Sequence, residues 1–184
     1  MKKILIFGSG GLVGSAVKRT FESDDNYKVF TPLRNEVDLF SFDETYNFIN
    51  KINPDWIINC AAKVGGILAN NTYRTEFLIE NLKINLNILE SCMGNNNINI
   101  INLGSSCIYP LNAENPIKES SFMDGKLEPT NSPYALAKIA AIELGKEIKY
   151  QYGNKIINLM PTNLYGYEDN FDLQTSHVLP AMIR

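Results

Sequence analysis

The feature that most constrains the fold is a glycine-rich turn between a short apolar run and an amphipathic segment. Residues 3–7 have the pattern of a buried strand, the turn is spaced Gly8-x-x-Gly11-x-x-Gly14, and residues 12–22 have the pattern of a helix. Glycines at this spacing allow a tight turn, close approach to a pyrophosphate and close helix–strand packing. Glycines also mark many ordinary turns, but this position at the first strand–helix junction favours a dinucleotide site.

Short apolar runs alternate with longer periodic segments along the rest of the chain. Further strands are expected at residues 27–33, 56–60, 98–103 and 155–160, and further helices at 41–51, 72–93 and 132–152. The helical spacing rests on Leu78, Leu82, Leu86 and Leu89 in one long helix, and on Leu136, Ala140, Leu144 and Ile148 in the other. Residues 110–130 have no sustained period and are expected to form a surface loop. The alternation predicts an α/β fold, a Rossmann-type doubly wound parallel sheet with flanking helices.

Composition narrows the class of protein. The chain has 184 residues, 45% of them hydrophobic, so we expect one domain over residues 1–184 with one sizeable core. The net charge of −3 provides no basic field for nucleic acid, and no apolar run approaches the roughly 20 residues of a membrane helix. The first apolar run is too short for a signal peptide, which favours a cytoplasmic protein. Cys60, Cys92 and Cys107 form no CxxC pair, so reduced thiols and no metal site are expected.

A second group of reactive residues follows the expected strand at residues 98–103. Ser105 and Cys107 come directly after this strand, where ligands bind in open α/β sheets. Tyr134 and Lys138 lie four residues apart, so they project from one helix face. The lysine charge is expected to lower the tyrosine pKa from its usual value of about 10. Ser105, Tyr134 and Lys138 thus match a carbonyl-reducing triad, although a surface tyrosine and lysine on an ordinary helix are the alternative.

The end of the second strand bears on the choice of nicotinamide cofactor. An arginine there pairs with a 2′-phosphate, whereas a carboxylate binds the ribose 2′-hydroxyl and repels the phosphate. Arg34 therefore favours NADP, and Glu36 and Asp38 weigh against it. Asp38 and Leu39 are expected near the adenine. The alternative is that Arg34 is a solvated surface residue.

Taken with the glycine turn and Tyr134-x-x-x-Lys138, further segments resemble the extended short-chain dehydrogenase/reductases and, within them, the GDP-L-fucose synthase branch. These segments are Ala61-Ala62-Lys63-Val64-Gly65-Gly66-Ile67, Gly104-Ser105-Ser106-Cys107-Ile108-Tyr109-Pro110, Glu128-Pro129-Thr130-Asn131, Met160-Pro161-Thr162-Asn163-Leu164-Tyr165-Gly166, Asp169-Asn170-Phe171 and Ser176-His177-Val178-Leu179-Pro180-Ala181. The resemblance covers essentially the whole chain. It implies an NADPH-dependent enzyme that epimerises GDP-4-keto-6-deoxy-D-mannose on both sides of its carbonyl and then reduces that carbonyl, giving GDP-L-fucose.

The resemblance also implies roles for individual residues. Cys107 becomes the base and His177 the acid of the epimerisation, although in isolation they would be a core cysteine and a surface histidine. Lys63 and Asn163 are placed near the site, and Asn85 is expected to support the active-site backbone or, alternatively, to be a solvated helix residue. The complete set of expected cofactor contacts is Gly8, Ser9, Gly10, Gly11, Leu12, Val13, Gly14, Arg34, Asp38, Leu39, Leu103, Gly104, Ser105, Ser106, Lys138, Pro161, Thr162, Asn163, Leu164 and His177.

Members of this branch continue with a smaller carboxyl-terminal domain that grips the GDP-sugar. That domain is expected to be missing from this chain, which would then be a fragment with little activity, because remote binding energy positions the reacting sugar. A homodimer through the helices at 72–93 and 132–152 is implied. Two alternatives stay open: an enzyme acting on a different GDP-keto-sugar, and a non-catalytic NADP-binding module.

Overall fold

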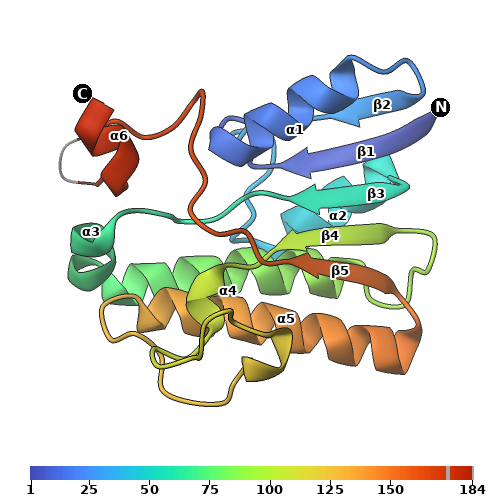
Figure 1. Cartoon of the computed structure of the whole chain (residues 1–184). Coiled ribbons are helices and arrows are strands. Elements are labelled where there is room, and N and C mark those ends of the chain that lie inside the picture. The colour runs from blue at the N-terminus through green and yellow to red at the C-terminus, as the bar shows by residue number, and fades with distance from the viewer. Residues whose placement is uncertain (173–174, 184) are drawn as a thin grey trace.

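The sheet consists of five parallel strands. In this computed structural model, which describes residues 1–172 and 175–183, the strand order is β2-β1-β3-β4-β5 (Figure 1). The strands are β1 (Lys2–Phe7), β2 (Tyr27–Phe30), β3 (Trp56–Asn59), β4 (Asn99–Leu103) and β5 (Lys155–Leu159). Because every neighbouring pair is parallel, all carboxyl ends lie at one edge of the sheet. The predicted Rossmann-type fold is confirmed, and the strand order changes direction between β1 and β3, where such folds bind ligands.

Helices cover both faces of the sheet. Figure 1 shows α1 on one face and α2, α4 and α5 on the other. The helices are α1 (Leu12–Glu22), α2 (Phe42–Ile52), α3 (Ile67–Thr72), α4 (Arg74–Ser91), α5 (Ser132–Tyr152) and α6 (Val178–Ile183). Ser41 caps α2 by accepting the Glu44 N–H at 3.3 Å, and α5 begins with a proline and ends at Gly153, whose φ is 79°. None of the described helices is long and apolar enough to cross a membrane.

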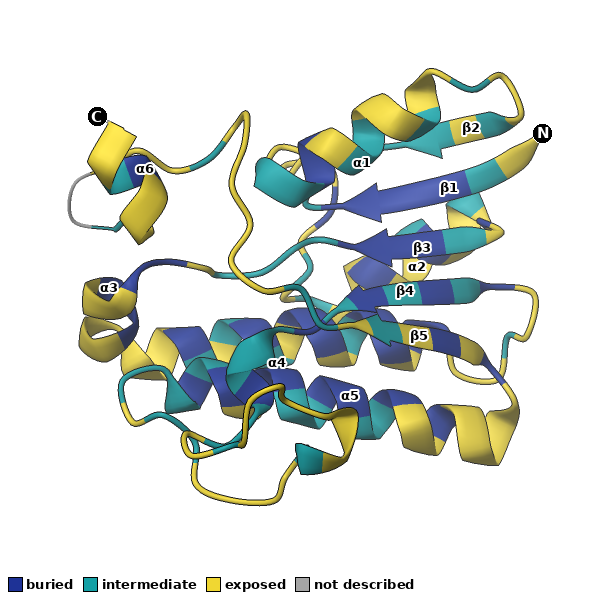
Figure 2. Cartoon of the chain, in the orientation of Figure 1, coloured by how far each residue is buried: buried dark blue, intermediate teal, exposed yellow. Residues whose placement is uncertain are grey.

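The core consists of two apolar layers that the strands separate by alternation. Along β1, Leu5 and Phe7 join the larger layer beneath α2, α4 and α5. Ile4 and Ile6 point the other way, into a smaller layer under α1. Burial of β1 on both faces explains its nearly continuous apolar sequence, and Figure 2 shows this strand as buried over most of its length.

Polar side chains occupy part of the buried face of both long helices. In α4 the buried positions include Asn81, Ile84 and Asn85, whereas Leu86 is 39% exposed. In α5 Lys138 is buried and Leu136 is half exposed, at 50%. The leucine spacing thus predicts the two helices but not which face of each is buried. The identities of the apolar residues alone therefore do not identify the core face.

Several element boundaries also differ from those expected. The second strand ends at Phe30 rather than residue 33, and Pro32, which has no N–H to donate, lies just beyond it. The helix expected over residues 72–93 is α4, which runs from Arg74 to Ser91, and the short helix α3 before it was not expected. Helix α6 and the short 3₁₀ turns η1 (Ser106–Ile108) and η2 (Glu119–Ser121) were not expected.

A row of asparagines lies across three neighbouring strands, at or next to their carboxyl ends. Asn59, Asn102 and Asn158 are in register on β3, β4 and β5. The Asn59 Nδ2 donates to Asn102 Oδ1 at 3.1 Å, and the Asn102 Nδ2 donates to Asn158 Oδ1 at 3.2 Å. Asn59 Nδ2 also donates to Asn85 Oδ1 of α4 at 3.1 Å. This row fixes the register of three strands because a one-residue slip would leave buried amides without partners.

One part of the sheet has an open face. Strand β5 lies at the edge, and its side chains alternate between Ile156, which is buried, and Ile157 and Leu159, each 47% exposed. These two residues lie on the same side of the sheet as α1, and α1 contacts only β1 and β2 among the element pairs with substantial contact. Figure 2 shows the exposed positions along β5.

The asparagine row predicts that Asn102→Ala destabilises the fold by about 2 kcal/mol, because Asn158 loses its donor and Asn59 loses an acceptor in a buried region. The measurement is chemical denaturation. Asn99→Ala is the matched control, since Asn99 lies at the start of the same strand and its side chain bonds an exposed carbonyl. If both substitutions lower the unfolding free energy equally, the asparagine row does not have this stabilising role.

Candidate active site

The glycine turn fits a bound pyrophosphate. Gly8 has a φ of 76°, which favours glycine, and a Cβ on Gly14 would overlap the Gly8 carbonyl oxygen. Gly11 is the N-cap of α1, and among the described residues no side chain caps this helix end. The first N–H groups of α1 are therefore available for an anion. The positions Ser9, Gly10, Leu12 and Val13 belong to the same turn and helix start.

The residues that follow β2 have local hydrogen bonds that bear on the choice of cofactor. The Glu36 carboxylate accepts the Leu33 N–H at 2.7 Å, and the Asp38 carboxylate accepts the Phe40 N–H at 2.8 Å. Both acidic side chains thus cap their own turns. Arg34 is exposed next to them. Leu39 packs against the larger core layer.

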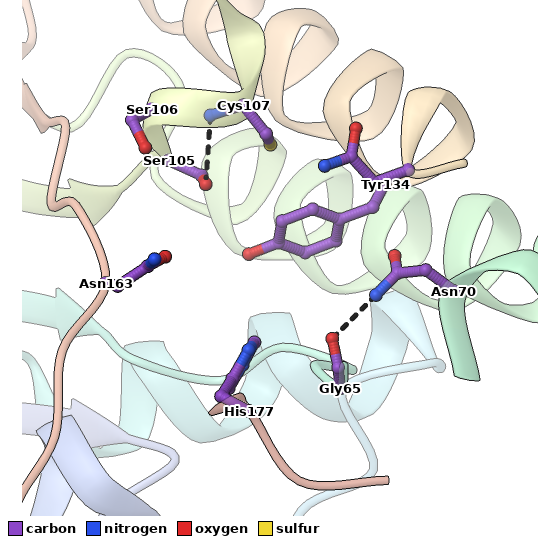
Figure 3. Close-up of a pocket in the computed structure, with 9 residues that line it drawn as sticks. Gly65, Asn70, Ser105, Ser106, Cys107, Tyr134, Asn163 and His177 are labelled. Carbon is purple, nitrogen blue, oxygen red and sulfur yellow. Dashed lines mark hydrogen bonds between the residues drawn. The ribbon is translucent and has the colours of Figure 1, made fainter. Parts of the chain in front are cut away.

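A cavity of about 270 Å³ lies beyond the carboxyl ends of the strands. Six of its lining residues were expected from the sequence: Ser105, Ser106, Cys107, Tyr134, Asn163 and His177. Three were not: Gly65, Asn70 and Asn131. Figure 3 shows the Tyr134 hydroxyl and the His177 ring directed into the space between these groups. The glycine turn, Arg34, Asp38 and Leu39 do not line this cavity, and neither does Lys138.

The ends of β4 and β5 are joined by backbone hydrogen bonds. The Gly104 N–H donates to the Leu159 carbonyl at 2.7 Å, and the Ser106 N–H donates to the Pro161 carbonyl at 3.1 Å. This pairing brings the segment of Pro161, Thr162, Asn163 and Leu164 beside the Gly104-Ser105-Ser106 segment. Ser105 Oγ in turn accepts the Cys107 N–H at 3.4 Å, at the start of η1 (Figure 3).

Lys138 is buried behind the cavity. It is 2% exposed, its Nζ donates to the Leu103 carbonyl oxygen at 2.7 Å, and burial lowers its pKa to about 8. Its Nζ lies 5.6 Å from the centre of the Tyr134 ring. We expected the lysine to lower the pKa of Tyr134, but burial raises that pKa, and the charge of Cys107 adds to the increase. Desolvation of the phenolate therefore dominates in the chain without ligands.

The two residues expected to move protons on carbon have different environments. Burial raises the pKa of the Cys107 thiol, and the hydrogen bond with Ser105 and the charge of Lys138 oppose that increase. His177 is exposed and directly precedes α6. The thiol thus lies on the dry side of the cavity and the imidazole on its open side.

The segment before His177 is held by residues that sequence reasoning missed. The Gly66 N–H donates to the Thr175 carbonyl at 2.9 Å, and a Cβ on Gly66 would overlap the Ser176 carbonyl oxygen. The carbonyls of Gly65 and Gly66 accept bonds from Asn70. Gly65 and Gly66 are adjacent in the sequence, and such a pair is the signal from which close backbone approach could have been predicted.

Lys63 and Asn85 are held in the layer beneath the cavity. Lys63 forms an ion pair with Glu80 at 2.8 Å, and Asn81 bonds both its N–H and its carbonyl. Asn85 is buried, so the alternative of a solvated helix residue is wrong. Its Nδ2 donates to the Asn81 carbonyl at 2.7 Å, which links the two asparagines of α4.

Comparison with known proteins gives consistent matches over the whole chain. The model of the NAD dependent epimerase/dehydratase family matches residues 4–184. A GDP-L-fucose synthase of Sinorhizobium fredii is 46% identical over 100% of this chain and 58% of that protein. Another, from Escherichia coli K12, is 43% identical over 100% of this chain and 57% of that protein. This chain therefore spans less than two thirds of the length of these relatives.

A solved structure also matches almost the whole of this chain. A GDP-D-glycero-L-gluco-heptose synthase from Campylobacter jejuni, in the presence of NADPH, superposes with a TM-score of 0.92 and 33% identity. The match covers 99% of this chain and 53% of that chain.

The buried amine of Lys138 predicts a pH-dependent contribution to stability. Above about pH 8 the folded chain releases this proton, while the unfolded chain keeps it up to its ordinary pKa near 10.5. The unfolding free energy of the native chain, relative to that of Lys138→Met, should therefore rise by about 3 kcal/mol between these pH values. Chemical denaturation across this range measures it.

Lys146→Met is the control for that experiment, because Lys146 is exposed on the same helix. The difference in unfolding free energy between Lys146→Met and the native chain should not vary with pH. If the difference for Lys138→Met is constant as well, burial does not lower the pKa of the Lys138 amine.

Proposed function

The chain belongs to the NAD dependent epimerase/dehydratase family, and we propose that it contains the cofactor site and reacting groups of a GDP-L-fucose synthase. In this proposal residues 1–184 form one NADP-binding domain that also provides the catalytic residues. The observation that carries the proposal is that Ser105, Cys107, Tyr134 and His177 line one cavity. Two reactions of a keto sugar, epimerisation and reduction, need this combination of a hydroxyl, a phenol, a thiol and an imidazole.

NADPH is the cofactor in this proposal. The glycine turn would hold its pyrophosphate, Arg34 its 2′-phosphate, and Lys138 its nicotinamide ribose. The local bonds of Glu36 and Asp38 support the role of Arg34, because carboxylates that cap turns are less able to bind a ribose hydroxyl. When bound, this cofactor supplies a hydride for the carbonyl carbon. The similar heptose synthase from Campylobacter jejuni has a structure in the presence of NADPH, which is consistent with this choice.

In the reduction step, proton transfer falls to Tyr134. Its raised pKa keeps the hydroxyl protonated, so it can donate a proton to the sugar oxygen as the carbonyl carbon gains the hydride. Ser105 donates a hydrogen bond to the same oxygen and fixes its position.

In the epimerisation steps, a C–H bond next to the carbonyl breaks and reforms on the opposite face. Cys107, as thiolate, takes the proton from carbon, and the electron pair moves to the carbonyl oxygen, where Ser105 and Tyr134 stabilise it. His177 then returns a proton to carbon from the other side. Burial raises the pKa of Cys107, and the hydrogen bond with Ser105 and the nearby charge of Lys138 are the interactions that favour its thiolate.

A related GDP-keto-sugar epimerase or reductase is the second candidate. The TM-score of 0.92 with a GDP-heptose synthase favours it, because the fold is shared with an enzyme whose name gives another sugar. Turnover of GDP-4-keto-6-deoxy-D-mannose compared with a GDP-keto-heptose distinguishes the two. A non-catalytic NADP-binding module would bind the cofactor and turn over neither sugar.

The assembly and location are also part of the proposal. A homodimer through α4 and α5 is supported by exposed apolar side chains on both helices, Ile79, Leu86 and Leu136. Sedimentation equilibrium would detect it. A cytoplasmic location suits the three free cysteines Cys60, Cys92 and Cys107, and cell fractionation would test it.

Replacing Cys107 should mainly lower epimerisation, whereas replacing Tyr134 should abolish reduction. In the complete gene product, incubated with GDP-4-keto-6-deoxy-D-mannose and NADPH, Cys107→Ser should lower epimerisation by on the order of 100-fold or more while some carbonyl reduction remains. Tyr134→Phe should abolish reduction. Deuterium uptake from solvent at the two carbons reports the first reaction, and NADPH oxidation the second.

The outcomes that contradict this assignment are specific. Equal loss of both reactions in Cys107→Ser would remove the separate role of the thiol. Absence of NADPH oxidation by the unmodified protein would refute the proposed function itself.

Arg34→Ala should weaken NADPH binding by about 10-fold to 100-fold and leave NADH binding unchanged, because only NADPH has the 2′-phosphate. Fluorescence titration with each cofactor measures this. Arg19→Ala, an exposed arginine on α1, is the control. An equal effect of Arg34→Ala on both cofactors would rule out the phosphate contact.

A further inference from the structure

Asn70 lines the cavity from α3, and its amide has a fixed orientation. It is 7% exposed, and its Nδ2 donates to the carbonyl oxygen of Gly65 at 2.7 Å (Figure 3). The same Nδ2 also donates to the carbonyl oxygen of Gly66 at 3.1 Å. Only the NH₂ end of an amide can serve two carbonyl acceptors. The Oδ1 end must therefore be the one turned away from the glycine pair.

The Oδ1 of Asn70 has no hydrogen-bond partner among the described residues, although it is fully buried. A buried carbonyl oxygen without a partner costs about 1–3 kcal/mol, and folded proteins rarely tolerate one without a reason. The Oδ1 of Asn131, in the same cavity, is in the same situation within the described part of the chain. A carbonyl oxygen can only accept, so a ligand that satisfies either residue must donate.

We propose that Asn70 determines substrate specificity by accepting, through Oδ1, a hydrogen bond from a ring hydroxyl of the sugar. This inference rests on the proposed function, because it takes GDP-4-keto-6-deoxy-D-mannose as the ligand. In that sugar C1 carries the diphosphate, C4 is a carbonyl, the C5 oxygen closes the ring and C6 is a methyl group. Only the hydroxyls at C2 and C3 remain as donors.

The position of Asn70 gives this bond a clear effect. The residue lines the same cavity as Tyr134 and Cys107, which act at C4 and at its neighbouring carbons in the proposed mechanism. A hydroxyl bound to Oδ1 would fix the rotation of the sugar ring relative to these two groups. A sugar without that hydroxyl would leave Oδ1 unpaired, which is how a buried acceptor discriminates against it.

The other end of the same amide has a structural task that the test must separate. The Nδ2 bonds hold the Gly65–Gly66 turn, and the Gly66 N–H holds the Thr175 carbonyl ahead of His177. Substitution of Asn70 could therefore lower activity by moving His177 alone. Only a loss that depends on one particular sugar hydroxyl reports on Oδ1.

The experiment compares Asn70→Ala with the unmodified protein on the parent sugar and on its 2-deoxy and 3-deoxy analogues. For the complete gene product, kcat/KM is measured from NADPH oxidation. Asn70→Ala should lower kcat/KM for the parent sugar by about 10-fold to 100-fold. With the unmodified protein, one of the two deoxy analogues should have a kcat/KM that is lower than that of the parent sugar by a similar factor. On that analogue, Asn70→Ala should lower kcat/KM by less than about a further 3-fold.

Asn71→Ala is the matched control. Asn71 is the next residue on α3, is exposed, and bonds only Arg74 at 3.4 Å among the described contacts. Its substitution should leave kcat/KM within about 2-fold for all three sugars. An equal loss for Asn70→Ala on the parent and both analogues would overturn the proposal and leave Asn70 a structural role only.

The unmodified protein alone gives a decisive outcome, which does not depend on a folded variant. If neither deoxy analogue lowers its kcat/KM by more than about 3-fold, no hydroxyl is recognised and the proposal falls. If the parent sugar is not turned over, the proposed function fails separately. The same comparison is then made by calorimetry with GDP-D-mannose and its two deoxy forms in the presence of NADP, and a hydroxyl-independent loss again overturns the role of Asn70.

Discussion

The hydrogen bond from the Lys138 amine to the Leu103 carbonyl is the interaction on which the site depends. It joins α5, which carries Tyr134, to the end of β4, which continues into Ser105 and Cys107. It also places a positive charge in a dry region, where burial lowers the pKa of the amine and raises the pKa values of the phenol and the thiol. Burial thus favours the neutral amine and the neutral thiol at this end of the sheet.

Hydrogen bonds between asparagine side chains hold three strands of the sheet in register with one another and with helix α4. Asn59 is the last residue of β3, and Asn102 and Asn158 lie one residue before the ends of β4 and β5, so this row fixes where Ser105 and the segment after β5 leave the sheet. Asn85 extends the row into α4. Apolar side chains at these positions would pack as well but would accept several registers, whereas paired amides accept one.

Sequence reasoning recovered what depends on local pattern. The alternation of strands and helices, the glycine turn after β1 and the position of Ser105 and Cys107 directly after β4 follow from short-range spacing, so the sequence predicts them. The burial of Asn81, Asn85 and Lys138 could not be predicted in this way, because these polar side chains are buried only through partners on other elements. The higher pKa of Tyr134 needed knowledge of burial. Asn70 was missed because its meaning depends on which carbonyls face it across a turn.

The exposed side of β5 has a consequence for the polypeptide in solution. Among the described residues β5 is an edge strand, and an edge strand can pair with another extended segment. Ile157 and Leu159 supply an apolar surface beside this edge. Two copies that meet there can continue one another's sheet, and a net charge of −3 spread over 184 residues opposes such contact only weakly. Charged residues placed on that strand would act as gatekeepers against aggregation.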